Sequence, residues 1–83
     1  MLNFKWSRTQ YGTPTLVGMV RNNTDRNYRY VQIEFNLYDD NGIQVGTAFD
    51  NVTNLEAGGI WRFEAIVSED TATRARLVRV TGW

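Results

Sequence analysis

The sequence predicts an all-β protein, folded as a sandwich or a small barrel of antiparallel strands. Six short segments with alternating apolar and polar residues follow one another at intervals of about 8 to 15 residues, and turn-forming residues separate them. Helical periodicity is almost absent, which argues against any α/β architecture. Eleven aromatic residues among 83 supply the large side chains that a small core needs without disulfide support.

The first two strands are expected at 2–7 and 15–21, joined through a turn at 11–14 that contains Gly and Pro. Both segments place apolar residues at every second position, as a strand with one buried face does. Gly18 interrupts the second series and leaves room for a large neighbouring side chain. The alternating residues are Leu2, Phe4, Trp6, Leu16, Gly18 and Val20.

The third strand, expected at 28–38, is the longest and most regular, and it runs directly into a polar turn. Asn41-Gly42 is the dipeptide that most readily adopts the positive φ angles of a tight hairpin turn. Asp39 is expected to accept hydrogen bonds from the amides of this turn. The sequence therefore predicts a hairpin in which Gly42 has a positive φ.

A fourth strand is expected at 43–49, followed by a long connection over 50–59. The fifth strand is expected at 60–67, with Ile60 and Ile66 as exceptions to its alternation, and 68–73 is compatible with one helical turn. The last strand, at 74–82, offers two inward sets, and a bulge would use both. The inward residues expected are Ile43, Val45, Thr47 and Phe49 in the fourth strand; Trp61, Phe63, Ala65 and Val67 in the fifth; and Ala75 with Leu77 or Val78 with Val80 in the last.

These registers converge on one predicted core. Each member occupies the apolar side of its strand, so the side chains meet between the two layers of a sandwich. The predicted core residues are Leu16, Val20, Val31, Ile33, Phe35, Leu37, Val45, Phe49 and Phe63.

Composition argues against most catalytic chemistry. The chain has neither His nor Cys, which removes the Ser-His-Asp and Cys-His arrangements and the usual zinc ligand sets. Asp39, Asp40 and Asp50 could approach one another and bind a hard cation such as calcium, although two polar turns are the favoured interpretation. We therefore expect no enzyme activity, no cofactor and no metal.

Charge argues against nucleic acid as a partner. Nine basic residues balance nine acidic ones, whereas proteins that bind phosphates normally carry a basic excess. Arg74, Arg76 and Arg79, joined by Arg62, could form a basic stripe near exposed aromatic rings. Arginines that guard an edge strand against aggregation are the favoured interpretation. No apolar run is long enough to span a bilayer, so an export signal or anchor would lie outside this sequence.

The sequence resembles the FxLYD domain over about residues 16–67. The motif Phe35-Asn36-Leu37-Tyr38-Asp39 is intact, and it is preceded by the segment 16–24 and followed at matching positions by Gly42, Leu55, Gly58, Gly59 and Phe63. The resemblance implies one immunoglobulin-like β-sandwich domain over 1–83, with six to seven strands. It also implies a bacterial or archaeal protein that is exported, membrane-anchored or a lipoprotein, and it transfers no catalytic residue.

Two hypotheses for function follow. The first is a non-catalytic structural or protein-interaction module of an extracytoplasmic or cell-surface prokaryotic protein. The second is a subunit of an ordered assembly, such as a filament or virion surface, joined through an edge strand or an aromatic patch. Tyr28, Tyr30 and Tyr38 are expected on the face of the third strand opposite Phe35, as a tyrosine strip for interaction with a protein partner. The alternative is that these rings cover neighbouring aliphatic side chains.

Overall fold

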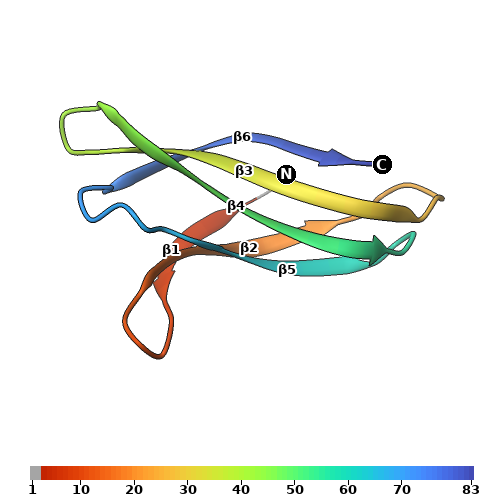
Figure 1. The fold of residues 1–83 in the computed structure, drawn as a ribbon. Helices are drawn as coiled ribbons and strands as arrows, with labels where there is room; N and C mark the ends of the chain where they lie inside the picture. The colour runs from red at the N-terminus through yellow and green to blue at the C-terminus, as the bar shows by residue number, and fades with distance from the viewer. Residues whose placement is uncertain (1–2) are drawn as a thin grey trace.

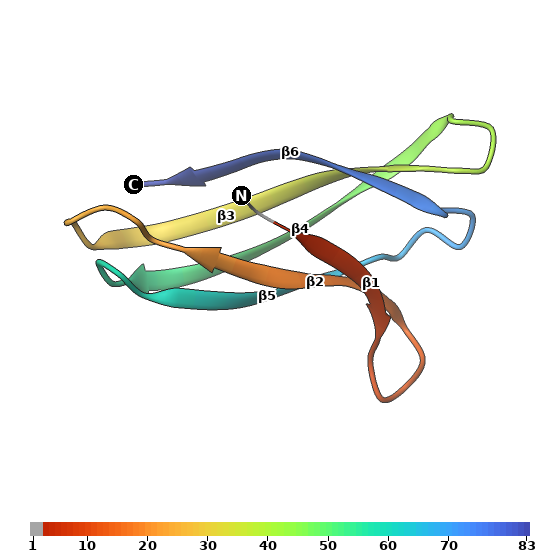
Figure 2. The same cartoon turned by 180° about the vertical axis from the view of Figure 1, so that it is seen from behind.

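The computed structural model describes residues 3–83, which form six antiparallel strands and no helix. The strands pack as two three-stranded sheets, as Figures 1 and 2 show from opposite sides. The sequence-predicted all-β sandwich is therefore confirmed. The strands are β1 (Phe4–Arg8), β2 (Pro14–Arg21), β3 (Tyr28–Tyr38), β4 (Gln44–Leu55), β5 (Ile60–Ile66) and β6 (Arg74–Gly82).

The strand orders are β1-β2-β5 in one sheet and β4-β3-β6 in the other. The chain changes sheets after β2, β4 and β5, and only β1–β2 and β3–β4 are hairpins within a sheet. In immunoglobulin terms these orders match A-B-E and C′-C-F. Residues 3–83 provide no strand at the position of strand G, which in that fold pairs with the free edge of β6.

The core lies between the sheets, and β3 contributes most to it. Phe35 lies at its centre, with the rings of Phe4 and Phe63 at centroid distances of 4.8 and 5.8 Å. Both edge-to-face and tilted ring contacts are favourable geometries for aromatic pairs. The buried apolar residues are Leu16, Val31, Ile33, Phe35, Leu37, Ala48, Leu55, Trp61, Phe63, Ala65 and Val67. Six predicted core residues are thus confirmed as buried, while Val20 and Val45 are half-buried against this core.

Phe49 was predicted to lie in the core, and this prediction is wrong, because its side chain is 58% exposed. Leu37 pairs with Gly46 but Tyr38 pairs with Gln44, so Val45 is an extra residue in β4. A bulge of this kind resets the alternation, which places Ala48 opposite Phe35 and turns Phe49 to the outer face. The predicted register of the fourth strand was wrong for this reason.

The β3–β4 turn confirms the positive φ predicted for Gly42 but not a positive φ at Asn41. Gly42 has φ 78°, whereas Asn41 does not have a positive φ. The Gly42 amide donates to the Asp39 carbonyl at 3.0 Å, and the Asp39 amide donates to the Ile43 carbonyl at 2.9 Å. This is the three-residue hairpin loop in which a left-handed Gly closes an ordinary turn. Asp39 Oδ1 accepts from the amides of Asn41 and Ile43, as predicted.

β4 continues to Leu55, so the expected connection over 50–59 is mostly strand. Residues 50–53 are polar or β-branched and pair with β3 from Ile33 to Tyr30. Tertiary pairing therefore overrides a weak local preference. The connection that remains between β4 and β5 is 56–59. Residues 68–73, which the sequence left compatible with one helical turn, contain a turn and no helix.

The predicted bulge is present in β6, and it combines Ala75 and Leu77 of the first apolar pair with Val80 of the second. Glu34 pairs with Arg79 and Phe35 with Leu77, which leaves Val78 as the extra residue. Ala75 and Leu77 pack against the core, and Val80 pairs with Ile33 on the same side.

The residues around Gly18 leave no space for a side chain at this position. A Cβ atom there would lie 2.7 Å from Phe63 Cζ and 2.5 Å from the Asn3 carbonyl oxygen. Gly18 and Phe63 are cross-strand partners, so the ring occupies the space that a side chain at residue 18 would need. The expectation of a large neighbour is confirmed.

Candidate interaction surfaces

The structure brings two of the three predicted tyrosines onto one face. Tyr30 and Tyr38 lie on the outer face of β3, opposite the buried residues of that strand. Tyr28 instead packs against the core, with its ring beside Gly82. The amides of Arg29 and Tyr30 both donate to the Trp83 carbonyl, at 2.9 and 3.1 Å, and this bulge-like pairing shifts the alternation at the start of β3.

Each tyrosine ring already has a neighbour within the chain, and all three side chains are half-buried. The Tyr30 ring lies 4.9 Å from the ring of Trp83. Arg26 lies over the Tyr28 ring at 4.9 Å and Arg76 over the Tyr38 ring at 5.7 Å. Intramolecular packing therefore accounts for part of the tyrosine surface, while Trp83 adds a ring that is 62% exposed.

A hydrogen-bonded row follows Tyr30 along the outer face of β3. Tyr30 Oη donates to Gln32 Oε1 at 2.9 Å, and Gln32 Nε2 donates to Glu34 Oε1 at 3.3 Å. Glu34 Oε1 then lies 3.8 Å from Arg79 Nε. This middle part of the face is polar and ordered, with Phe49 as its exposed apolar neighbour on β4.

Three arginines share one side of the edge strand β6. Arg74, Arg76 and Arg79 pair with Tyr38, Asn36 and Glu34, which all lie on the outer face of β3. Within residues 3–83 the Arg79–Glu34 contact is the single ion pair, so Arg74 and Arg76 have no carboxylate partner there. Arg62 does not join them, because it pairs with Met19 on the outer face of the other sheet.

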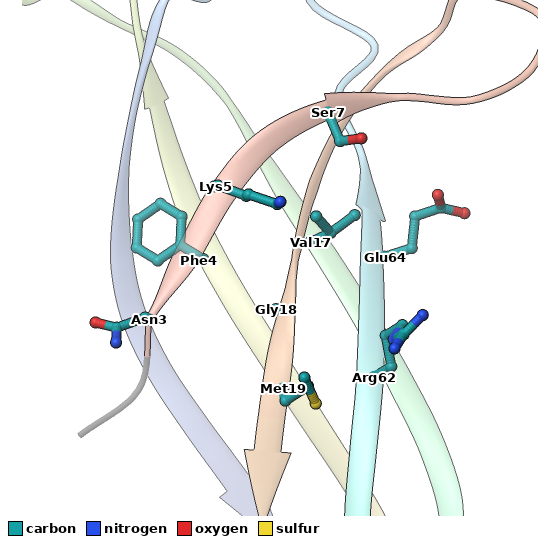
Figure 3. A pocket seen from close by; sticks show the side chains of 9 residues that line it. All are labelled: Asn3, Phe4, Lys5, Ser7, Val17, Gly18, Met19, Arg62 and Glu64. Atoms are coloured by element: carbon teal, nitrogen blue, oxygen red, sulfur yellow. The ribbon is translucent and has the colours of Figure 1, made fainter.

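The outer face of the β1-β2-β5 sheet holds a second surface that we did not predict. In Figures 1 and 2 the β1–β2 hairpin projects away from the sandwich. An open concavity of about 780 Å³ lies on this outer face, with Lys5, Val17, Met19, Arg62 and Glu64 among its lining residues (Figure 3).

Apolar side chains lie exposed on this outer face. Met19, Ile60 and Ile66 are 56%, 62% and 48% exposed. Met19 and Ile60 pair with exposed Arg62 and Arg21, and Ile66 lies between buried Ala65 and Val67, so all three are on the outer side. The signal was present in the sequence, because Ile60 and Ile66 are the exceptions to the alternation of the fifth strand. Several apolar residues that lie together at solvent-facing strand positions indicate an interaction surface.

The sandwich has two sides, each formed by one edge strand of either sheet, β4 with β5 and β1 with β6, and these two sides differ. On the side of β4 and β5, the Asp50 carboxylate on β4 accepts the backbone amide of Glu64 on β5 at 2.8 Å and so occupies one backbone donor of that edge. On the side of β1 and β6, Trp6 pairs with buried Leu16 and Val80 pairs with buried Ile33, so both face the core. Trp6 is nevertheless 39% exposed and Val80 41% exposed. The core is therefore less covered along the β1/β6 side.

The three carboxylates considered for calcium are not brought together. Asp39 caps the β3–β4 turn, Asp40 accepts the Thr73 hydroxyl at 2.7 Å, and Asp50 accepts a backbone amide of β5. Asp50 pairs with Ile33, roughly 20 Å along β3 from Asp39 at about 3.3 Å per residue. Across residues 3–83 no group of three or more His, Cys, Asp or Glu side chains is placed to hold a metal ion.

Comparison with known proteins supports the fold. No protein-family model matches the chain. No curated protein matches it either. Among solved structures, it is similar to a DUF1425 family member from Shewanella sp. pv-4, with a TM-score of 0.65 and 20% sequence identity over 96% of this chain and 71% of that chain. At this identity the likeness shows a common β-sandwich-like fold and nothing about function. Over residues 3–83, no helix is long and apolar enough to cross a membrane.

Proposed function

We propose that this chain is a non-catalytic interaction module of an extracytoplasmic prokaryotic protein and a member of the FxLYD group. The supporting observation is the outer face of the β1-β2-β5 sheet, where exposed Met19, Ile60 and Ile66 surround charged Arg62 and Glu64. Exposed apolar and methionine side chains with charged neighbours are typical of protein interfaces. The extracytoplasmic location rests on the FxLYD resemblance alone.

Site-specific photo-crosslinking in intact cells of the host tests the interaction. A photoreactive phenylalanine analogue at Met19 is expected to form a covalent adduct with a partner protein. The same analogue at Asp25, an exposed residue of the β2–β3 loop, is the matched control and is expected to form none. Equal labelling at Met19 and Asp25, or no adduct from Met19, would contradict the proposal.

The location has its own test, because the sequence contains no cysteine. A single Asp25→Cys substitution supplies one exposed thiol for a membrane-impermeant maleimide. Labelling in intact cells at the level found in lysed cells supports an extracytoplasmic module. Labelling only after lysis contradicts that part of the proposal.

A second candidate function is a subunit of an ordered assembly, and the open β1/β6 side favours it. An unpaired strand edge beside an incompletely covered core is a common site of association. Mass measurement in solution by light scattering, over a range of protein concentrations, distinguishes the two. Growth into oligomers favours assembly, and a constant monomer mass favours the interaction module.

A further inference from the structure

The free edge of β6 is the position where the immunoglobulin-like fold places one more strand. β6 pairs with β3 on one side, and none of residues 3–83 forms a strand on the other. A strand added there continues the β4-β3-β6 sheet and lies across the sandwich from β1. On the opposite side of the molecule, by contrast, the Asp50 carboxylate already occupies one backbone donor of the β5 edge, the amide of Glu64.

The side chains along this edge define what an added strand must present to the core. Trp6 and Val80 face inward but keep about two fifths of their surface exposed, at 39% and 41%. A strand beside β6 alternates its side chains between the two faces of the sheet. Apolar residues at every second position would therefore cover Trp6 and Val80 and complete the apolar layer.

The outer face sets the other half of the pattern. Arg74, Arg76 and Arg79 all point to the outer face of β6, and only Arg79 has a carboxylate partner within residues 3–83. Residues directly opposite on neighbouring strands interact, and opposite charges stabilise the pair while like charges destabilise it. The outward residues of an added strand are therefore expected to be acidic.

The same charges argue against two other occupants. Antiparallel pairing of β6 with β6 of a second copy, centred on the bulge, would set Arg76 of each copy beside Arg79 of the other, which like-charge repulsion disfavours. A single-stranded nucleic acid would satisfy the arginines but would leave the inward-facing Trp6 and Val80 uncovered.

We propose that the β6 edge binds an extended segment of a partner protein that carries apolar and acidic residues in alternation, by strand addition. Backbone hydrogen bonds to β6 supply affinity, and the alternating side chains supply specificity. The bulge at Val78 divides the edge into two short stretches, Arg74–Leu77 and Arg79–Gly82. Pairing with both stretches requires a partner strand that follows this bend. The proposal rests on the proposed role as an interaction module and assigns it a second surface.

Binding of synthetic peptides to the protein isolated from its host tests the proposal. The probe is a fluorescein-labelled peptide of alternating valine and glutamate, nine residues long as β6 is. Peptides of the same length with alternating valine and lysine, or with the valines and glutamates in separate blocks, are the controls. We expect fluorescence anisotropy to show saturable binding of the first peptide only.

Two variants locate the site. Replacing Arg74, Arg76 and Arg79 together by Gln should weaken binding by roughly tenfold, because three cross-strand charge pairs are lost. Arg21→Gln makes the same exchange at an exposed position of β2, in the other sheet, and should leave binding unchanged. Methylating alternate backbone nitrogens of the peptide should abolish binding, since strand addition needs backbone hydrogen bonds.

Several results would overturn the proposal. Tight binding of the lysine peptide, equal weakening by Arg21→Gln, or indifference to backbone methylation would show that no strand is added at β6. Displacement of the probe by a thymidine oligonucleotide would show a general polyanion surface. A segment of the same polypeptide already seated on the edge would block the probe and would also overturn it. A crosslink from Met19 together with no peptide binding would leave the proposed function standing and reject this inference alone.

Discussion

The side chain of Asn22 makes five hydrogen bonds, to the β2–β3 loop and to the end of β4. Its side chain is 4% exposed, and Nδ2 donates to the carbonyls of Arg26, Leu55 and Glu56 at 2.9, 3.2 and 3.1 Å. Oδ1 accepts from the amide and hydroxyl of Thr24. One side chain therefore holds the β2–β3 loop against the end of β4.

Asn22→Ala is expected to destabilise the protein by about 2 to 4 kcal/mol, because five hydrogen bonds of a buried side chain are lost, among them the buried bond to the Leu55 carbonyl. Asn23→Ala is the matched control, since Asn23 is exposed and should change stability by less than about 0.5 kcal/mol. Urea unfolding measures both. Similar losses for the two variants would mean that Asn22 does not anchor the loop.

Thr15 presents the opposite case of a buried polar atom without a partner. Its side chain is fully buried, and Thr15 Oγ1 makes no hydrogen bond. Thr15→Val keeps the shape and removes the unsatisfied hydroxyl, so we expect a gain of about 1 kcal/mol. Thr47→Val, at an exposed position of β4, should change stability much less. A higher melting temperature for Thr15→Val alone is the expected observation, and a lower one would contradict the assignment.

Two phenylalanines test the register of the sandwich. Phe35→Ala should cost about 3 to 5 kcal/mol, a large part of the stability of a small domain. Phe49→Ala removes the same atoms from the outer face of β4 and should cost less than about 1 kcal/mol. Denaturant midpoints of the two variants measure these losses. A larger loss for Phe49→Ala than for Phe35→Ala would support the sequence-predicted register, in which Phe49 is buried.

At the scale of elements, strands whose alternation runs unbroken were predictable and bulged strands were not. β3 from Val31 onward and β5 throughout keep a strict period of two, so their buried residues Ile33, Phe35 and Phe63 follow from the sequence. In β4 a single extra residue, Val45, moves every later side chain to the other face. No local signal marks that residue, because the bulge arises from pairing with β3.

The second half of β4 was missed for a related reason. Asp50, Asn51 and Asn54 are poor strand formers, and pairing with β3 makes this segment a strand. The same limit applies to the candidate surfaces. Tyr30 and Tyr38 follow from alternation, whereas the shift that moves Tyr28 to the core depends on Trp83, which is 55 residues away in the sequence.

The β3–β4 turn gives a prediction at this scale. Gly42→Val should destabilise the protein by about 1 to 2 kcal/mol, because a β-branched residue is strained at φ 78° even though no contact is removed. Gly42→Asn should lose less, since Asn tolerates the left-handed region. Thermal unfolding of both variants measures the difference. Equal losses would mean that backbone strain is not the cause.

At the scale of the whole molecule, the two sides of the sandwich are built differently. On one side a carboxylate of β4 accepts a backbone amide of β5 and links the two sheets, and the other side leaves β6 free beside inward-facing apolar side chains. Exposed edges are usually protected in soluble proteins, by charges, bulges or covering groups. β6 carries both charges and a bulge, which restrict what can pair with it.

The β4/β5 side can be tested directly by amide hydrogen exchange. Glu64 donates its amide to Asp50 rather than to another strand, so its protection depends on that one carboxylate. In Asp50→Ala we expect the Glu64 amide to exchange much faster, while the amide of Ile33, on the central strand β3, stays protected to the limit set by global stability. Asp40→Ala removes a carboxylate of the β3–β4 turn and should leave Glu64 unchanged. Faster exchange at Ile33 and Glu64 alike would mean that Asp50 supports the whole fold, and no change at Glu64 would mean that something other than Asp50 protects this amide.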